Sequence, residues 1–326
     1  MMYQPVPIGA KSGLLMGLVS LAGLFMFAWP LFLPAAPSAV QHAQDAPFVF
    51  IVTLPLLILL VLAQLADGGM DAKALAMLGV LSAVNAALRP LSAGVSGIES
   101  VFLLLILAGR VFGPGFGFVL GCTSLFGSAL LTAGVGPWLP FQMLAAAWVG
   151  LLAGLLPRRL GRHQIKGAGE IGLLAVYGVI AAYVFGALMN LWFWPYIAGS
   201  TMGGDSGLAY VPGAPIGVNL THFALFSLVS STAVWDTGRA ATNVVLLVAL
   251  GPGVLAILRR ALVRASFTNQ QDVFVPVAGV GRRQLMAAEP TAHATWPASA
   301  RARASFRSIA SPSLPPRPRT SGGALG

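Results

Sequence analysis

Long apolar runs separated by short polar segments dominate the chain. Eight runs approach or exceed the length that crosses a hydrocarbon layer of about 30 Å as a helix. They cover residues 13–33, 47–66, 73–88, 98–112, 115–132, 138–157, 170–197 and 238–258. The first run has a longer apolar core than the 7–15 residues usual in a cleaved signal peptide, so we interpret it as an anchor helix. The pattern predicts an all-α, polytopic membrane helix bundle.

A further segment, residues 219–235, is apolar enough to form a ninth crossing. A ninth crossing would place the basic residues after position 258 on the opposite side from the other basic clusters. We therefore interpret 219–235 as a re-entrant or interfacial piece, or as a bent extension of the last helix.

Basic residues predict the orientation, because Lys and Arg accumulate in short cytoplasmic segments. They follow or precede the runs at Lys11, Lys73, Arg110, residues 158–166 and residues 259–264. All these clusters fall on one side if the chain starts inside and crosses eight times. We expect a multi-pass protein of the plasma membrane with both termini cytoplasmic, in which Arg89 is the exceptional short-loop basic residue on the outer side.

Composition supports a membrane protein. The chain is 57% hydrophobic and 9% charged, whereas ordinary soluble domains are about a quarter charged. Much of the net charge of +10 lies after Leu262, where eight arginines stand against two acidic residues, so the charge does not favour nucleic-acid binding. Three parts are predicted: 1–70 with two transmembrane helices, a six-helix membrane core at 71–262, and a disordered basic cytoplasmic tail at 263–326.

Small residues recur every four positions in three of the runs. This spacing puts them on one helix face, where helix backbones can approach closely in lipid. The contact is either within the chain or with a partner protein. The three stripes are Gly79, Ala83 and Ala87; Gly113, Gly117 and Gly121; and Ala146, Gly150 and Gly154.

Sequence signatures of catalysis and nucleotide hydrolysis are missing. The glycines near position 115 follow no strand and precede no Gly-Lys-Ser/Thr, so they do not indicate an ATP-binding loop. None of the four histidines stands at metal-ligand spacing from another ligand residue. The single cysteine, Cys122, lies within an apolar run and is interpreted as a packed residue. We expect the chain itself to bind no cofactor and no metal.

Polar and aromatic residues gather near the predicted outer boundary, where burial in lipid is costly unless they have partners. One interpretation pairs Arg89 with Glu99 and Asp236 with Arg239. The tryptophans suit either an interfacial belt or, with the polar groups, a small-molecule pocket. The candidate substrate-binding residues are Asn85, Arg89, Glu99, Trp138, Gln142, Asn190, Trp194, Asp236 and Asn243.

The core from Lys73 to Arg260 resembles the substrate-binding S component of an energy-coupling-factor (ECF) vitamin transporter. The resemblance rests on KALAMLGVLSAVNAALRPL, GIESVFLLLILAGRVFGPGFGFVLGCTSLF, GVGPWLPFQMLAAAWVGLLAGLLPRR and WDTGRAATNVVLLVALGPGVLAILRR. It implies a six-helix core with both termini inside and a vitamin or related micronutrient bound near the outer face. The two additional N-terminal helices and the tail depart from the family's minimal pattern.

The resemblance also implies partners, namely a transmembrane T protein and two ABC-type ATPases that use the ATP. Gly79, Ala83 and Ala87 correspond to the family's docking motif, and the stripe at Gly113, Gly117 and Gly121 is a second candidate docking face. Substrate release would follow toppling of the S component in the membrane.

The sequence leaves the substrate open among cobalamin, riboflavin, thiamine precursors and other cofactors. A corrinoid is the runner-up within the family, because distant members with this extended form resemble cobalamin carriers. Two other classes of function remain as alternatives. One is a membrane enzyme acting on a lipid or peptide through Glu99, Asp236 and His222, and the other is a non-transporting scaffold.

Overall fold

The computed structural model describes residues 10–28, 31, 55, 57–59, 61, 72–91, 97–201, 207–211 and 213–266. The chain divides into residues 1–271 and 272–326, and the second of these units lies wholly outside the described residues. Most of the predicted second run, 47–66, and almost all of the predicted tail lie there too. The three-part division of the chain therefore stays a prediction.

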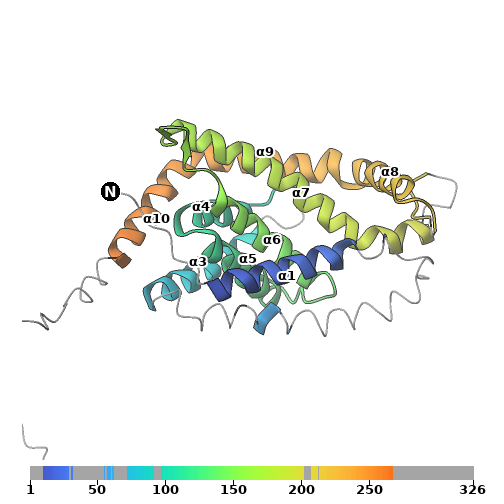
Figure 1. Ribbon diagram of the computed structural model, residues 1–326, viewed down its shortest axis with the longest axis horizontal. Helices are drawn as coiled ribbons and strands as arrows, with labels where there is room; N and C mark the ends of the chain where they lie inside the picture. Colours follow the sequence, from blue (N-terminus) through green and yellow to red (C-terminus); the bar gives the residue numbers. More distant parts are fainter. Residues whose placement is uncertain are drawn as a thin grey trace, which may run out of the picture. The chain divides into compact units, whose positions relative to one another are not determined.

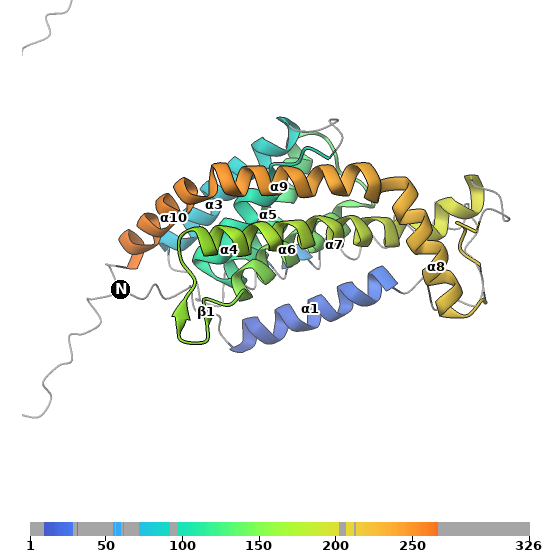
Figure 2. The same cartoon turned by 90° about the horizontal axis from the view of Figure 1, so that it is seen from above.

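The described part is an all-α bundle with one two-stranded hairpin (Figures 1 and 2), which confirms the predicted fold class. Its helices are α1 Ala10–Ala28, α3 Ala72–Leu91, α4 Val101–Phe112, α5 Pro114–Leu131, α6 Leu139–Leu155, α7 Ala168–Thr201, α8 Ile216–Ser227, the π-helix η2 Leu228–Asp236, α9 Thr237–Ala249 and α10 Gly251–Ser266. The hairpin pairs β1 Arg159–Leu160 with β2 His163–Gln164.

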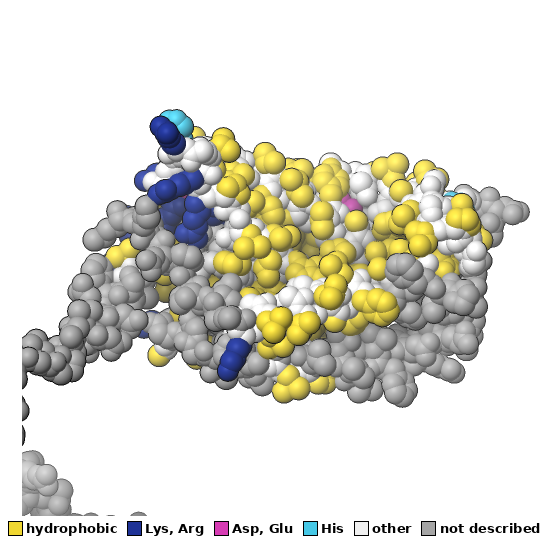
Figure 3. Space-filling model, viewed as in Figure 1, with side chains coloured by type: hydrophobic (Ala, Val, Ile, Leu, Met, Phe, Trp, Pro, Cys, Tyr) yellow, Lys and Arg dark blue, Asp and Glu magenta, His cyan; other side chains and the backbone are white. Residues whose placement is uncertain are grey.

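Five helical stretches of the described residues are long and apolar enough to span a membrane: α1, α3, α5, α7 and the stretch from Ile216 to Ala249. Helices α4 and α6 are shorter and equally apolar. Apolar side chains cover much of the visible long face, while Lys and Arg gather at the end that carries the hairpin and α10 (Figure 3). This distribution is what a membrane helix bundle with one charged end requires.

Helix α4 lies at the centre of the bundle and is buried along its whole length. A helix that is apolar on all sides is stable only when other helices or lipid surround it. Gly113 then ends α4 with a backbone φ of 104°, a conformation that favours glycine. Pro114 follows at the first turn of α5, where its missing N–H costs no hydrogen bond.

Helices α5 and α6 pack with their backbones in close contact. A Cβ added to Gly117 would overlap the carbonyl of Gly150, one added to Gly150 would overlap the carbonyl of Gly117, and one added to Gly121 would overlap the backbone of Ala147. The stripe at Gly113, Gly117 and Gly121 is therefore covered by α6 within the chain. This corrects the expectation that it docks a partner, because no second helix fits where α6 already lies.

The predicted last crossing has different bounds in the structure. Helix α8, η2 and α9 follow one another without a break, so the apolar stretch runs from Ile216 to Ala249. Leu250 then separates it from α10. The predicted run 238–258 therefore combined the end of one helix with the start of another. Residues 219–235 form the bent extension of the last crossing, which was one of the two alternatives.

Candidate functional site

A small, partly open cavity lies where α3, α4, α5, α6 and α7 meet. Its volume is about 40 Å³, and Arg89, Glu99, Phe102, Gln142 and Phe185 are among the lining residues. Arg89 donates a hydrogen bond from Nη2 to Oε1 of Gln142 at 2.8 Å. Three of the predicted site residues, from three separate parts of the chain, thus share one cavity with two aromatic side chains.

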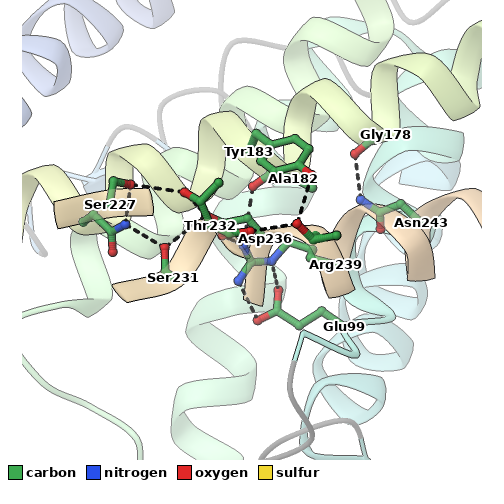
Figure 4. Close-up of polar contacts among 12 residues, drawn as sticks. Glu99, Gly178, Ala182, Tyr183, Ser227, Ser231, Thr232, Asp236, Arg239 and Asn243 are labelled. Atoms are coloured by element: carbon green, nitrogen blue, oxygen red, sulfur yellow. Dashed lines mark hydrogen bonds and ion pairs between the residues drawn. The ribbon is translucent and has the colours of Figure 1, made fainter. Parts of the chain in front are cut away.

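Arg239 of α9 pairs with Glu99, which lines this cavity, and with Asp236 (Figure 4). Its Nε lies 2.8 Å from Oε2 of Glu99, and its Nη1 lies 2.7 Å from Oδ1 of Asp236. The predicted Asp236–Arg239 pair is therefore present. The guanidinium also lies over the rings of Phe102 and Phe185, with its central carbon 5.8 and 5.1 Å from their centroids. The buried charge of Arg239 is thus balanced by two carboxylates and two aromatic rings. The sequence predicted only one of these partners, Asp236.

A chain of side-chain hydrogen bonds extends from Asp236 along η2 toward α7 and α8. Ser231 and Thr232 donate to Oδ2 of Asp236 at 3.0 and 3.3 Å. Asn190 of α7 donates from Nδ2 to the hydroxyls of Ser227 and Ser231, both at 2.7 Å (Figure 4). The predicted residues Asn190, Asp236 and Glu99 thus belong to one connected network, although Asn190 does not line the cavity.

The charges of this region balance. Arg89 and Arg239 stand against Glu99 and Asp236, and Arg239 and Asp236 are 7% and 1% exposed. A charge so deeply buried is tolerated only when it is paired and hydrogen-bonded. Asp236 also lies directly against Gly186 of α7, where any side chain would overlap its carboxylate. The absence of a side chain at position 186 therefore creates the space that the acid occupies.

A family model described as "ECF transporter, substrate-specific component" matches residues 73–258. The match runs from the start of α3 into α10 and includes every residue that lines the cavity. The chain belongs to this family. No curated protein and no solved structure shows significant similarity to it. It is thus a membrane protein and a substrate-binding subunit of a transporter.

In this S component, four of the predicted site residues lie apart from the cavity and the network. Asn85 donates to Ser124 at 3.1 Å, and Asn243 donates to the carbonyl of Gly178 at 2.9 Å. Trp194 is fully buried and donates to the carbonyl of Leu208 at 2.7 Å. Trp138 is 42% exposed, as an interfacial residue would be. The structure gives Asn85, Asn243 and Trp194 contacts within the chain and does not bring them to the cavity.

The predicted docking stripe on α3 of the S component faces outward. Gly79, Ala83 and Ala87 are all exposed, and a Cβ added to Gly79 would meet nothing within 4 Å. Val80 and Val84 beside them are 63% and 45% exposed. The stripe is therefore open on the described part of the chain, in contrast to the glycines of α5.

The residues named for an enzymatic alternative form no visible catalytic set. Glu99 and Asp236 both pair with Arg239, while a ring nitrogen of His222 lies 2.8 Å from the carbonyl of Ala209. Within the described residues, no group of His, Cys, Asp and Glu has the arrangement of a metal site. The ECF family match points to a transporter subunit instead.

A second ionic cluster lies at the other end of α7. Glu170 accepts hydrogen bonds from Arg110 at 2.8 Å and from Arg259 of α10 at 2.6 Å. Arg110 also donates to the carbonyls of Leu156 and Pro157, at 2.9 and 3.1 Å. Arg158 donates to the carbonyl of Arg110, and burial, followed by repulsion from Arg110, lowers the pKa of Arg158 below its ordinary value. In the sequence these arginines indicated only the orientation of the chain.

Proposed function

We propose that this S component captures a vitamin or related micronutrient at the outer side of the membrane and delivers it inward with a T protein and two ABC-type ATPases. The cavity at Arg89, Glu99 and Gln142 is the site of capture. The observation that carries this proposal is the convergence of three polar side chains and two phenylalanines inside a bundle of the ECF substrate-specific family. Aromatic walls with a few placed polar groups are typical of small-molecule sites.

The dimensions of the cavity indicate how capture proceeds. At about 40 Å³ it has room for only a few waters, since a cavity needs about 10–15 Å³ of this kind to hold one water. Sites for drug-sized ligands measure about 300–1,000 Å³. Substrate binding therefore requires the walls to move apart. The Arg89–Gln142 hydrogen bond, which joins α3 to α6, is the contact that a polar ligand would replace.

The energy for delivery comes from partners in this proposal, because ATP is hydrolysed by the ATPases. The open stripe at Gly79, Ala83 and Ala87 supports docking of the T protein, since small residues let a partner helix approach closely. Replacing Gly79 by Leu should reduce copurification of the T protein and ATPases without changing the thermal stability of the isolated subunit. Undiminished copurification would place the contact elsewhere.

Thermal unfolding of the purified chain with a panel of vitamins tests the binding site. A ligand at 100 times its dissociation constant stabilises the folded state by about 2.7 kcal/mol. The stabilisation should disappear in Gln142→Leu, which removes the amide from the cavity. Gln164→Leu is the matched control, because Gln164 is exposed in the hairpin. A vitamin that stabilises both variants as much as the wild type would contradict the proposed position of the site. A panel in which no vitamin stabilises the wild type would contradict the proposed class of substrate.

A further inference from the structure

A second and larger cavity of about 380 Å³ lies between α1, α6 and α7. Its lining includes Ser20, Trp148, Tyr177 and Val184. Helix α1 lies outside the region that the family model matches, residues 73–258. This cavity is therefore built partly from a helix that the family pattern does not contain.

The polar groups in the lining are already satisfied by the chain. The indole Nε1 of Trp148 donates to the hydroxyl of Ser20 at 3.0 Å. The hydroxyl of Tyr177 donates to the carbonyl of Val149 at 2.6 Å. The cavity thus offers a ligand almost no hydrogen-bonding partner, and a polar molecule would lose its hydration without compensation. Its occupant must be apolar.

The cavity opens sideways between membrane helices. Leu24 of α1, Leu152 of α6, and Ile180 and Val184 of α7 line it and are 51%, 46%, 54% and 49% exposed. Helices α1 and α7 are long and apolar enough to span the membrane, so these side chains border hydrocarbon. An apolar protein cavity of about 150 Å³ already binds benzene, and this one is more than twice as large.

Contacts of α1 with α6 keep the cavity in place. Phe27 packs edge-on against Phe141, with ring centroids 5.1 Å apart, and lies 5.8 Å from the ring of Trp148. Gly23 lies directly against the side chain of Leu144, where a Cβ would overlap it. Helix α1 thus touches α6 closely, it also contacts α7 directly, and the cavity lies among the three helices.

We propose that this cavity holds one acyl chain of a membrane phospholipid, which fills the space among α1, α6 and α7 and adds to the direct contacts between the additional helix and the family core. The acyl chain matches the apolar lining, the sideways opening and the satisfied polar groups. Because no charged residue lines the cavity, the headgroup of the lipid does not contribute to recognition. The site is distinct from the cavity at Arg89, and the side chain of Phe185 forms a wall between the two.

Native mass spectrometry of the full chain released from detergent micelles tests this proposal. Val184→Trp and Ile180→Trp place a ring at the opening of the cavity. Val176→Trp is the matched control, on the same helix, 60% exposed and outside the lining. Excluding two methylenes of the acyl chain from an apolar site weakens its binding on the order of tenfold. We expect one retained phospholipid in the wild type and the control, and its loss in the other two variants.

Circular dichroism first establishes that all three variants keep their helical content. The retained mass should be found equally with phosphatidylglycerol and with phosphatidylethanolamine. A retained mass that matches detergent or a second copy of the chain would overturn the proposal. Equal lipid retention in the control and in both cavity variants would overturn it as well, as would retention of one headgroup class alone.

Discussion

Two buried clusters of arginines and carboxylates lie at different places along α7, and they differ in what surrounds them. Around Arg239, two carboxylates face one guanidinium, two phenylalanine rings lie beside it, and a cavity adjoins. Around Glu170, two arginines share one carboxylate and one of them also binds backbone carbonyls. An ion pair alone therefore does not distinguish the two clusters; the adjoining cavity with aromatic walls is what favours the first cluster as the proposed binding site.

The second cluster has a structural role instead. Arg110 ends α4, Glu170 begins α7 and Arg259 lies on α10, so the three side chains join three helices at the basic end of the bundle. Arg110 and Glu170 are 4% and 3% exposed. The comparison predicts that breaking the cluster around Arg239 lowers the free energy of unfolding and abolishes ligand binding. Breaking the cluster around Glu170 should lower the free energy of unfolding alone.

Removing Arg239 should have the largest effect. Arg239→Leu leaves Asp236 buried without its cation and removes the hydrogen-bonded partner of Glu99, and losing one member of a buried pair costs about 3 to 5 kcal/mol. Denaturant unfolding in detergent measures this loss, and vitamin binding should disappear with it. Arg260→Leu, at an exposed position of α10, is the control and should change stability little. A stable Arg239→Leu protein that still binds ligand would show that the network around Arg239 does not contribute to the binding site.

Neutralising Glu170 sharpens the comparison. In Glu170→Gln, Arg110 keeps its carbonyl partners but loses its buried counter-charge, and Arg259 loses its acceptor pair. We expect a destabilisation of about 3 kcal/mol, near the lower end of the range for breaking a buried pair. The folded fraction should bind ligand with unchanged affinity in equilibrium titrations. A large fall in affinity would show that the two clusters are coupled.

The two glycine stripes allow a further test of buried against open surfaces. Gly117→Ala forces a methyl group into the carbonyl of Gly150, and overpacking of this kind costs about 1 to 3 kcal/mol. Gly79→Ala has open space around it and should leave thermal unfolding unchanged or slightly improve it, since Ala is the better helix residue. Equal destabilisation by both changes would contradict the assignment of the two faces.

These glycines also show what the sequence could and could not predict. The apolar runs predicted the positions of most helices, because a segment that crosses a membrane must be long and apolar. The same demand makes inward and outward faces equally apolar, so both stripes looked like docking surfaces. Only the packing of α6 against α5 distinguishes them. Phe102 and Phe185 were missed at the site for the same reason, because nothing separates them from other apolar residues of their helices.

The polar residues that line the cavity carried more signal in the sequence than their apolar neighbours. Arg89, Glu99 and Gln142 stood out because charge and amide groups are costly near lipid, and the structure brings them to one cavity. Their partners depend on how helices far apart in the chain are rotated against one another. Arg239 carried a usable signal, a cation in an apolar stretch three residues after an acid, but its second partner Glu99 is 140 positions away and no local pattern reveals it.

The hydroxyl network along η2 should give the smallest effect. Ser231→Ala removes one donor to Asp236 and one acceptor for Asn190, while Thr232, Arg239 and Ser227 still serve these two groups. A single hydrogen bond contributes about 1 kcal/mol to stability, so unfolding should shift by about that amount. Ser230→Ala, at the exposed neighbouring position, is the matched control and should leave the free energy of unfolding unchanged.

Because Asp236 in turn holds Arg239 and Arg239 holds Glu99, we also expect Ser231→Ala to weaken ligand binding measurably while Ser230→Ala does not. Loss of stability without any change in affinity would show that the network ends at Asp236 and supports the helix bundle alone.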